Sequence, residues 1–168
     1  MRNKNIAKYN GKKLELIELI YYDGVKLQVD LDNNIVLAWY DEKASCEEWF
    51  CIRLQKDMLV KYLSNKLSLL DIILEGKVDL VYRDYDNYNL LTFSKNIMAS
   101  NRLDYELPDS DSFLGFDFTK ESIYLQNMFK LYFKKNIYST TKSTSTSKRV
   151  DKIDYKYKQK ESIYEVAC

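Results

Sequence analysis

Apolar and polar residues alternate in the first third of the chain, and this period of two predicts strands that bury one face. In residues 25–31 every odd-numbered residue is apolar and every even-numbered residue is polar. The preceding segment, residues 14–22, is rich in Leu, Ile and Tyr, and Gly24 stands between the two segments. Glycine adopts the positive φ that a tight turn requires, so the two segments should pair as a hairpin.

Two more strands should follow directly. Asp32-Asn33-Asn34 supplies turn residues that tolerate left-handed geometry, and residues 35–40 resume a β-branched and aromatic run. After a polar stretch, residues 49–54 are again apolar enough for a strand. Short loops join strands that are neighbours in a sheet, so these four strands should form an antiparallel meander.

Helices packed on this sheet are predicted next, because the apolar period changes to 3.6. Residues 55–65 should form the first helix. A second, short helix should span residues 69–74, with Ser68 as its N-cap and Gly76 at its end. Alternation then returns, and residues 78–93 should form a second hairpin around a polar turn.

The last predicted elements lie between residues 112 and 135. Residues 112–118 carry aromatic side chains and predict a strand. Thr119 should cap the longest helix, residues 120–135, whose apolar residues recur at helical spacing. Tyr124 and Phe133 lie off that apolar stripe, so the helix is a candidate partner surface.

These elements predict an α+β fold over residues 1–138, with an antiparallel β-sheet of meander and hairpins, packed helices and a flexible C-terminal extension. Residues 139–147 contain eight Ser or Thr in nine positions, a composition that buries no core, and should be a linker. Residues 148–168 form a basic and aromatic tail. In the tail Tyr155 and Tyr157 alternate with charged residues, which suits an edge strand added to the sheet or to a partner.

Four short motifs follow one another within residues 14–118. They are Ile20-Tyr21-Tyr22-Asp23-Gly24, Ala38-Trp39, Lys66-Leu67-Ser68-Leu69-Leu70-Asp71 and Leu107-Pro108-Asp109. In this order they resemble a family of small bacterial and phage proteins of unknown function. The resemblance implies a compact β-rich fold with packed helices, and it transfers no catalytic residues.

Length and composition narrow the class of protein. A chain of 168 residues that is 46% hydrophobic can build one domain with a core. No apolar run approaches the ~20 residues that span a bilayer, and the N-terminus lacks the apolar stretch of a signal peptide, so we expect a cytoplasmic protein. Cys46, Cys51 and Cys168 are odd in number and should be free thiols. Abundant Lys, Asn, Ile and Tyr indicate a low-GC bacterium or its phage.

The net charge of +1 conceals two basic ends around an acidic middle. Residues 1–13 carry five basic and no acidic side chains, and residues 148–160 carry six basic and two acidic ones. Residues 14–147 carry 15 basic and 21 acidic side chains. The basic ends either contact phosphates or serve as solubilising termini, and both interpretations stay open.

Histidine is absent from the sequence. This excludes Ser/His and Cys/His nucleophilic pairs, histidine general bases and histidine metal ligands. The three cysteines are too few for a four-ligand zinc site without an added carboxylate. The chain also has neither a Walker nor a dinucleotide-binding glycine pattern, so the sequence predicts no cofactor.

Two carboxylate pairs are the remaining candidates for metal-dependent chemistry. Asp84 and Asp86 stand two residues apart in a predicted turn, and Asp109 and Asp111 do so beside the single proline. Each pair could bind Mg²⁺, and each could equally be a solvated turn that caps its own backbone. A nuclease site could also combine Asp109 with Lys156, but the Ser/Thr-rich linker between them disfavours a rigid placement.

Fifteen tyrosines are the other unusual feature. Tyrosine offers a stacking face and a hydroxyl at small entropic cost, so a Tyr/Arg cluster suits a protein interface or a stacked nucleobase. Codon bias with strand filling explains the same abundance without a function. The candidate partner- or ligand-binding residues are Tyr82, Arg83, Tyr85, Tyr88, Tyr124, Phe133, Tyr155 and Tyr157.

The leading functional hypothesis is a non-catalytic protein-binding module of a low-GC bacterium or phage, acting as an inhibitor in the contest between phage and host defences. A second hypothesis is a protein that sequesters a small nucleotide-like signal between Tyr and Arg side chains. A third is a metal-dependent nuclease or nucleotide hydrolase. Nucleic acid is the least expected partner, because the acidic middle of the chain would repel it.

Overall fold

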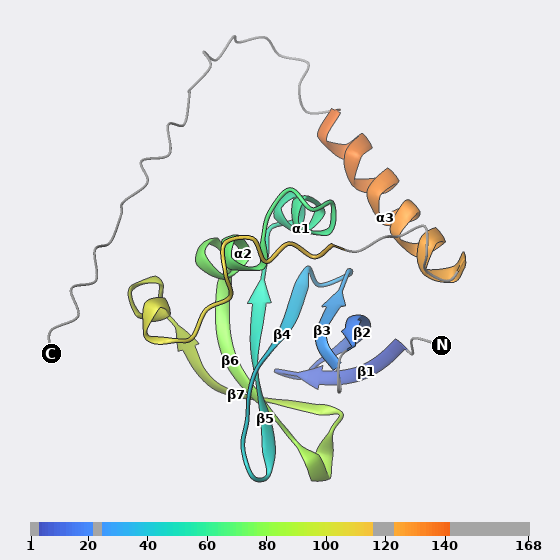
Figure 1. The fold of residues 1–168 in the computed structure, drawn as a ribbon. Coiled ribbons are helices and arrows are strands. Elements are labelled where there is room, and N and C mark those ends of the chain that lie inside the picture. Colours follow the sequence, from blue (N-terminus) through green and yellow to red (C-terminus); the bar gives the residue numbers. More distant parts are fainter. Residues whose placement is uncertain (1–3, 22–24, 116–122, 142–168) are drawn as a thin grey trace, which may run out of the picture.

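The computed structural model describes residues 4–21, 25–115 and 123–141 (Figure 1). The strands are β1 (Lys4–Tyr9), β2 (Lys12–Tyr21), β3 (Val25–Asp30), β4 (Ile35–Glu42), β5 (Cys46–Arg53), β6 (Lys77–Asp84) and β7 (Leu90–Ile97). The α-helices are α1 (Lys56–Leu63), α2 (Leu69–Glu75) and α3 (Ile123–Thr141), and the 3₁₀ helices are η1 (Tyr85–Asn87) and η2 (Ala99–Asp104). Within these residues, no helix is long and apolar enough to cross a membrane.

The seven strands close into a barrel in which sequential strands pair antiparallel and β1 pairs parallel with β7. The closing contact is short, since it joins only Lys8 to Leu90 and Tyr9 to Leu91. The predicted α+β architecture, an antiparallel sheet of meander and hairpins with packed helices, is therefore wrong. The sequence pattern predicts no strand in the basic N-terminal segment, and without β1 the sheet cannot close.

The predicted meander is present as β2 to β5, and the second hairpin is present as β6 and β7. The β2–β3 turn, with Gly24, lies outside the described residues. The strand predicted over residues 112–118 is wrong where it can be compared, because residues 112–115 have no regular structure. The remainder of that segment is outside the described part of the chain.

Local signals place the two short helices correctly. Gln55 is the N-cap of α1. The Ser68 side chain accepts a hydrogen bond from the Asp71 backbone N–H, and the Asp71 carboxylate accepts one from the Ser68 backbone, which is a capping box. Gly76 ends α2 at a position without room for a side chain, since a Cβ there would lie 2.6 Å from the Ile72 carbonyl oxygen.

One face of every strand points into the barrel. The apolar side chains of this inner core are Ala7, Tyr9, Leu14, Leu16, Ile35, Leu37, Trp49, Cys51, Val81 and Leu91. Polar groups are buried among them, and the Asp79 carboxylate accepts hydrogen bonds from the Tyr9 hydroxyl and from Arg53, both at 2.8 Å, and from Asn96 at 2.7 Å. Alternation predicts that the polar face of each strand contacts solvent, but in the barrel polar residues on this face are buried.

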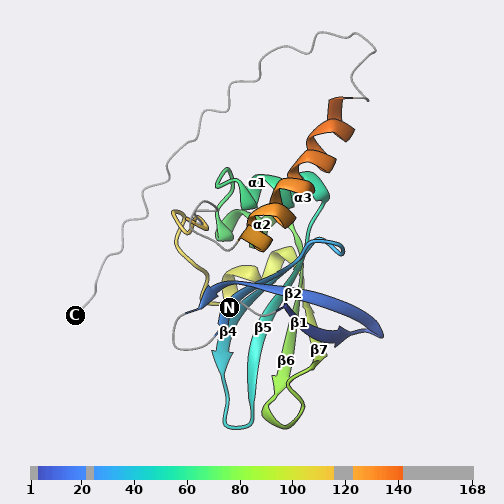
Figure 2. The ribbon, with the colours of Figure 1, turned by 90° about the vertical axis from the view of Figure 1, so that its right-hand side faces the viewer.

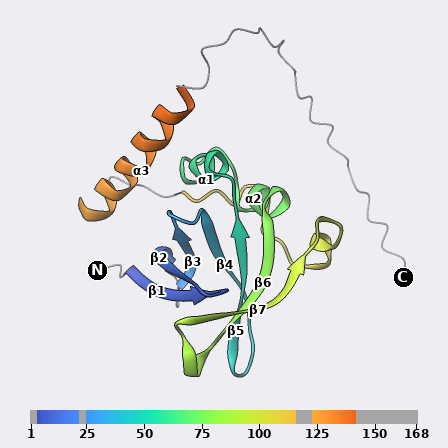
Figure 3. The ribbon, with the colours of Figure 1, turned by 180° about the vertical axis from the view of Figure 1, so that it is seen from behind.

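The opposite face of β2 to β7 packs against the helices and forms a second core. Leu59 and Leu63 of α1, Ile72 of α2 and Phe129 of α3 are buried in it. Figures 2 and 3 show from two further directions that the helices gather at one end of the barrel, whereas the β4–β5 and β6–β7 turns lie at the other. The molecule therefore has a helical end and a turn end.

The helix predicted over residues 120–135 ends later than expected, because α3 runs from Ile123 to Thr141 in the described part of the chain. Residues 120–122, where the predicted helix begins, lie outside the described residues. The first three residues of the predicted linker thus belong to this helix. The rest of the linker, the tail of residues 148–168 and its proposed edge strand lie outside the described residues, so these stay predictions.

Candidate functional site

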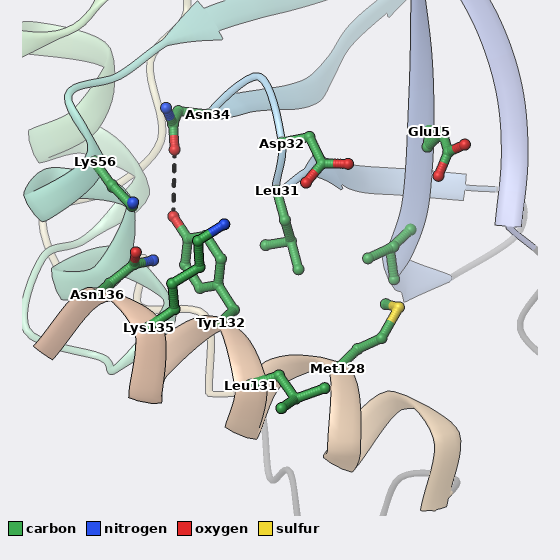
Figure 4. A pocket seen from close by; sticks show the side chains of 11 residues that line it. Glu15, Leu31, Asp32, Asn34, Lys56, Met128, Leu131, Tyr132, Lys135 and Asn136 are labelled. Carbon is green, nitrogen blue, oxygen red and sulfur yellow. Dashed lines mark hydrogen bonds between the residues drawn. The ribbon is translucent and has the colours of Figure 1, made fainter. Parts of the chain in front are cut away.

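A pocket of about 360 Å³ lies at the helical end, between α3 and the barrel (Figure 4). One wall is β2 with the β3–β4 turn, the other wall is α3, and the first residue of α1 lies at one side. The lining residues are Glu15, Ile17, Leu31, Asp32, Asn34, Lys56, Met128, Leu131, Tyr132, Lys135 and Asn136.

The barrel wall is held in place by the buried carboxylate of Asp30 at the end of β3. One of its oxygens accepts a hydrogen bond from the Asn33 backbone N–H and the other accepts one from the Glu15 backbone N–H, each at 2.8 Å. Asn34 completes the turn with a φ of 53°, a left-handed conformation that asparagine tolerates. The turn is thus fixed to β2, and Asp32 at its tip stays exposed.

The helical wall is anchored by Phe129, which is only 1% exposed. Tyr132, one turn further along α3, donates a hydrogen bond from its hydroxyl to Oδ1 of Asn34 at 3.3 Å (Figure 4). Met128 is half-buried against the core, whereas Leu131 is 68% exposed at the rim of the pocket. The helix therefore shows an apolar side chain to solvent beside an open pocket.

The acidic and basic side chains around the pocket lie on different walls. Glu15 and Asp32 belong to the barrel wall, and Lys56 and Lys135 belong to the helices. Asp32, Lys56 and Lys135 are exposed, and Glu15 is half-buried. The pocket thus presents an acidic and a basic side around an apolar floor.

Burial raises the pKa of Tyr132 to about 12. Its hydroxyl is consequently a neutral hydrogen-bond donor at every physiological pH. Asn136, on the next turn of α3, is a buried amide in the same wall. The pocket has an apolar floor, an amide, a phenol and charges of both signs, so it is suited to binding an amphipathic group.

The predicted Tyr/Arg cluster lies at the turn end of the barrel, away from this pocket. Arg83 is 1% exposed and points into the barrel, where its guanidinium lies 4.4 Å from the ring centroid of Tyr88. Tyr82 points to the opposite face of β6 and is half-buried. Tyr85 donates a hydrogen bond to Glu42 at 2.6 Å, and this bond, with a smaller contribution from desolvation, raises the pKa of Tyr85 to about 12. The structure therefore brings Arg83 and Tyr88 together and separates them from Tyr82.

Of the candidate binding residues predicted in the long helix and the tail, the structure describes the side chain of Phe133. Phe133 contacts Phe129 and Tyr132 of the same helix, with ring centroids 6.4 and 6.1 Å apart, and packs against the core that α3 shares with the strands. The side chain of Tyr124, and Tyr155 and Tyr157 in the tail, lie outside the described part of the structure.

The candidate metal ligands are scattered. Asp84 and Asp86 are exposed around the start of η1, and Asp109 and Asp111 are exposed in the loop that precedes α3. Among the described residues, no group of three or more Cys, Asp or Glu side chains is placed to hold a metal ion. Of the cysteines in that part of the chain, Cys46 is half-buried and Cys51 is buried, and both are free.

The pocket residues were not predicted, because they come from four segments that are far apart in sequence. Asp32 and Asn34 belong to a predicted turn, Lys56 to the start of a predicted helix, and Lys135 to the end of another. Each has an ordinary local explanation as a turn residue or a solvated helix end. Only the docking of α3 on the barrel places them around one cavity.

No protein-family model, curated protein or solved structure matches the chain. The resemblance to small bacterial and phage proteins therefore stays a prediction from the sequence motifs.

Proposed function

We propose that the protein is a binding protein whose pocket between α3 and the barrel receives an apolar side chain of a partner protein. The supporting observation is Leu131, which is 68% exposed at the rim of a pocket lined by Met128 and Leu31. An apolar side chain held in water beside an open, partly apolar pocket is typical of a protein-interaction site.

The charges around the pocket support a defined orientation of the partner. A bound segment would place acidic groups near Lys56 and Lys135 and basic groups near Glu15 and Asp32. Such complementarity contributes more to specificity and association rate than to affinity. The proposed partner segment therefore has an apolar residue flanked by charges of both signs.

The test is native mass spectrometry of the full chain recovered from extract of a low-GC bacterium, with Leu131→Asp as the variant. We expect the wild-type protein to carry the mass of a partner polypeptide and Leu131→Asp to lose it. A carboxylate at the rim would have to be desolvated against the partner, which is unfavourable. Circular dichroism checks that the variant is folded.

Leu103→Asp is the matched control, because Leu103 is also an exposed leucine, at 82%, but lies in η2 and does not line the pocket. This variant should keep the partner. Retention of the partner by Leu131→Asp, or equal loss in both variants, would contradict the assignment of the pocket.

The small-molecule hypothesis gives a different outcome in the same experiment. A volume of about 360 Å³ is near the lower end of the range of ligand pockets. An added mass of ligand size in place of a polypeptide would favour sequestration of a small molecule. The role as an inhibitor in phage–host contests remains the prediction made from the sequence.

A further inference from the structure

Arg83 is a buried cation inside the turn end of the barrel. It lies on β6, and its Nη2 donates a hydrogen bond to Oε1 of Gln28 on β3 at 3.2 Å. Two strands, β4 and β5, separate β6 from β3 in the sheet, so this bond crosses the barrel interior. Arg83 is 1% exposed and Gln28 is fully buried.

Within the described part of the chain, the charge of Arg83 has no close counter-ion. Among the described residues the ion pairs join other side chains, and no carboxylate lies within 4.0 Å of this guanidinium. Glu47 is its direct neighbour across β5 and β6, but the Glu47 carboxylate accepts a hydrogen bond from Nε1 of Trp49 at 3.1 Å. Burial of a cation without an ionic partner is unfavourable.

The groups without hydrogen-bond partners here are all donors. They are Nε and Nη1 of Arg83 and Nε2 of Gln28, and each is fully shielded from solvent. Buried polar atoms without partners are rare in folded proteins, so three such donors in one place are unusual. Because these unsatisfied atoms are donors and one of the two residues is cationic, the site is complementary to an acceptor that carries negative charge.

Two aromatic rings enclose the guanidinium. Its Cζ lies 5.1 Å from the ring centroid of Trp49 and 4.4 Å from that of Tyr88. Trp49 is buried, whereas Tyr88 is 40% exposed in the turn before β7. The partly exposed ring of Tyr88 therefore lies against the buried guanidinium.

We infer that Arg83 and Gln28 form a site, covered by Tyr88, for an oxyanion group of a small ligand. Arginine is the side chain best suited to carboxylate and phosphate oxygens, since its N–H groups are fixed in one plane and stay charged. The site lies at the turn end of the barrel and is independent of the pocket at the helical end.

The test uses the full-length protein with inorganic phosphate and, separately, acetate as probes. Arginine Nε–H resonances are followed by NMR at constant ionic strength, which is maintained with sodium chloride. We expect the Arg83 resonance to shift saturably with one of the probes, and the more effective probe distinguishes a phosphate from a carboxylate ligand. If neither anion moves the Arg83 resonance, the inference is wrong.

Thermal unfolding gives an independent measurement, because a ligand that binds only the folded state raises the Tm. Phosphate also stabilises proteins without binding them, so the comparison with a variant decides. The phosphate-dependent rise should be smaller in Arg83→Met than in wild type. It should be unchanged in Arg53→Met, which removes the exposed arginine that pairs with Asp79, and in Leu131→Asp. An equal rise in wild type and Arg83→Met would overturn the inference.

Arg83→Met could also fail to fold, so Tyr88→Ala provides a second variant. Tyr88 is partly exposed, and its removal should leave the barrel folded. With the covering ring gone, the Arg83 resonance should exchange faster between free and phosphate-bound forms. An unchanged exchange rate would contradict the role of Tyr88.

Discussion

At a few positions in this protein, the available space or the backbone conformation permits only one type of residue. Gly76 is such a residue, because a Cβ there would lie 2.6 Å from the Ile72 carbonyl oxygen and 2.9 Å from side-chain atoms of Ile52 and Leu54. The backbone oxygen belongs to α2 and cannot move far without opening the helix. The sequence-based explanation, that glycine ends a helix, is right about the position and incomplete about the cause.

We predict that Gly76→Ala lowers the free energy of unfolding by about 1–3 kcal/mol, the usual effect of overpacking a core. Urea denaturation measures it. Gly11→Asn is the control, since Gly11 has a φ of 74° that asparagine tolerates and nothing within 4 Å of a Cβ. The control should change stability by less than about 1 kcal/mol. Equal stability of Gly76→Ala and wild type would contradict the prediction and show that the last turn of α2 shifts to make room for the methyl group.

At the scale of elements, α3 is attached to the body by one face. Phe129 is buried in the core that the helices share with the strands, and Tyr132 and Phe133 pack beside it. Leu131 points away from this core and is mostly exposed. The same helix therefore contributes to folding with one face and to the proposed interaction site with another.

We predict that Phe129→Ala releases α3 from the barrel, because loss of a buried phenylalanine costs about 3–5 kcal/mol. Hydrogen exchange should show lost protection in α3 and retained protection in β5. Leu131→Ala is the matched control and should leave the protection of α3 unchanged. Normal protection of α3 in Phe129→Ala would mean that other contacts hold the helix.

At the scale of the whole molecule, buried tyrosines link stability to alkaline pH. The ordinary tyrosine pKa is 10.0, and burial raises the pKa of Tyr132 to about 12. The pKa values of Tyr9 and Tyr62 are raised further, by burial in both and also by the Asp79 carboxylate in Tyr9. Each folded phenol thus holds its proton more tightly than the unfolded one does.

Stability should therefore be fully present below about pH 10 and decline as the pH rises from 10 towards 12, because the unfolded state then loses protons that the folded state retains. Urea denaturation at increasing pH measures the decline. Tyr62→Phe keeps the buried ring but removes one phenol, so its decline should be shallower. Constant stability up to pH 12 in the wild-type protein would contradict the prediction.

Much of the fold was predictable from the sequence, because its signals are local. Alternation predicted β3 and β6, and apolar or aromatic runs predicted β2, β4, β5 and β7. Ser68 predicted the start of α2, and the turn residues predicted sequential antiparallel pairing. β1 was not predicted, since its residues look like a basic terminus. The closing contact of Tyr9 with Leu91 joins segments that no local pattern relates.

The candidate sites were less predictable. The sequence suggested an exposed cluster at Tyr82, Arg83, Tyr85 and Tyr88, and the alternation of β6 correctly implies that Tyr82 and Arg83 lie on opposite faces. It does not tell which face is in contact with water. In the closed barrel Arg83 lies in the interior and not on the surface, and the ring of Tyr88 packs against its guanidinium.

The sequence by itself thus determined which residues share a face of each strand, where the two short helices lie, and that strands joined by short turns are neighbours, because these follow from periodicity, caps and turns. Tertiary structure alone decided that the sheet closes, that the polar face carrying Gln28, Asp79 and Arg83 is buried, and that α3 and the β3–β4 turn enclose a pocket. The physical reason is that a period of two sorts side chains between two faces, whereas burial of a face depends on contacts between distant segments.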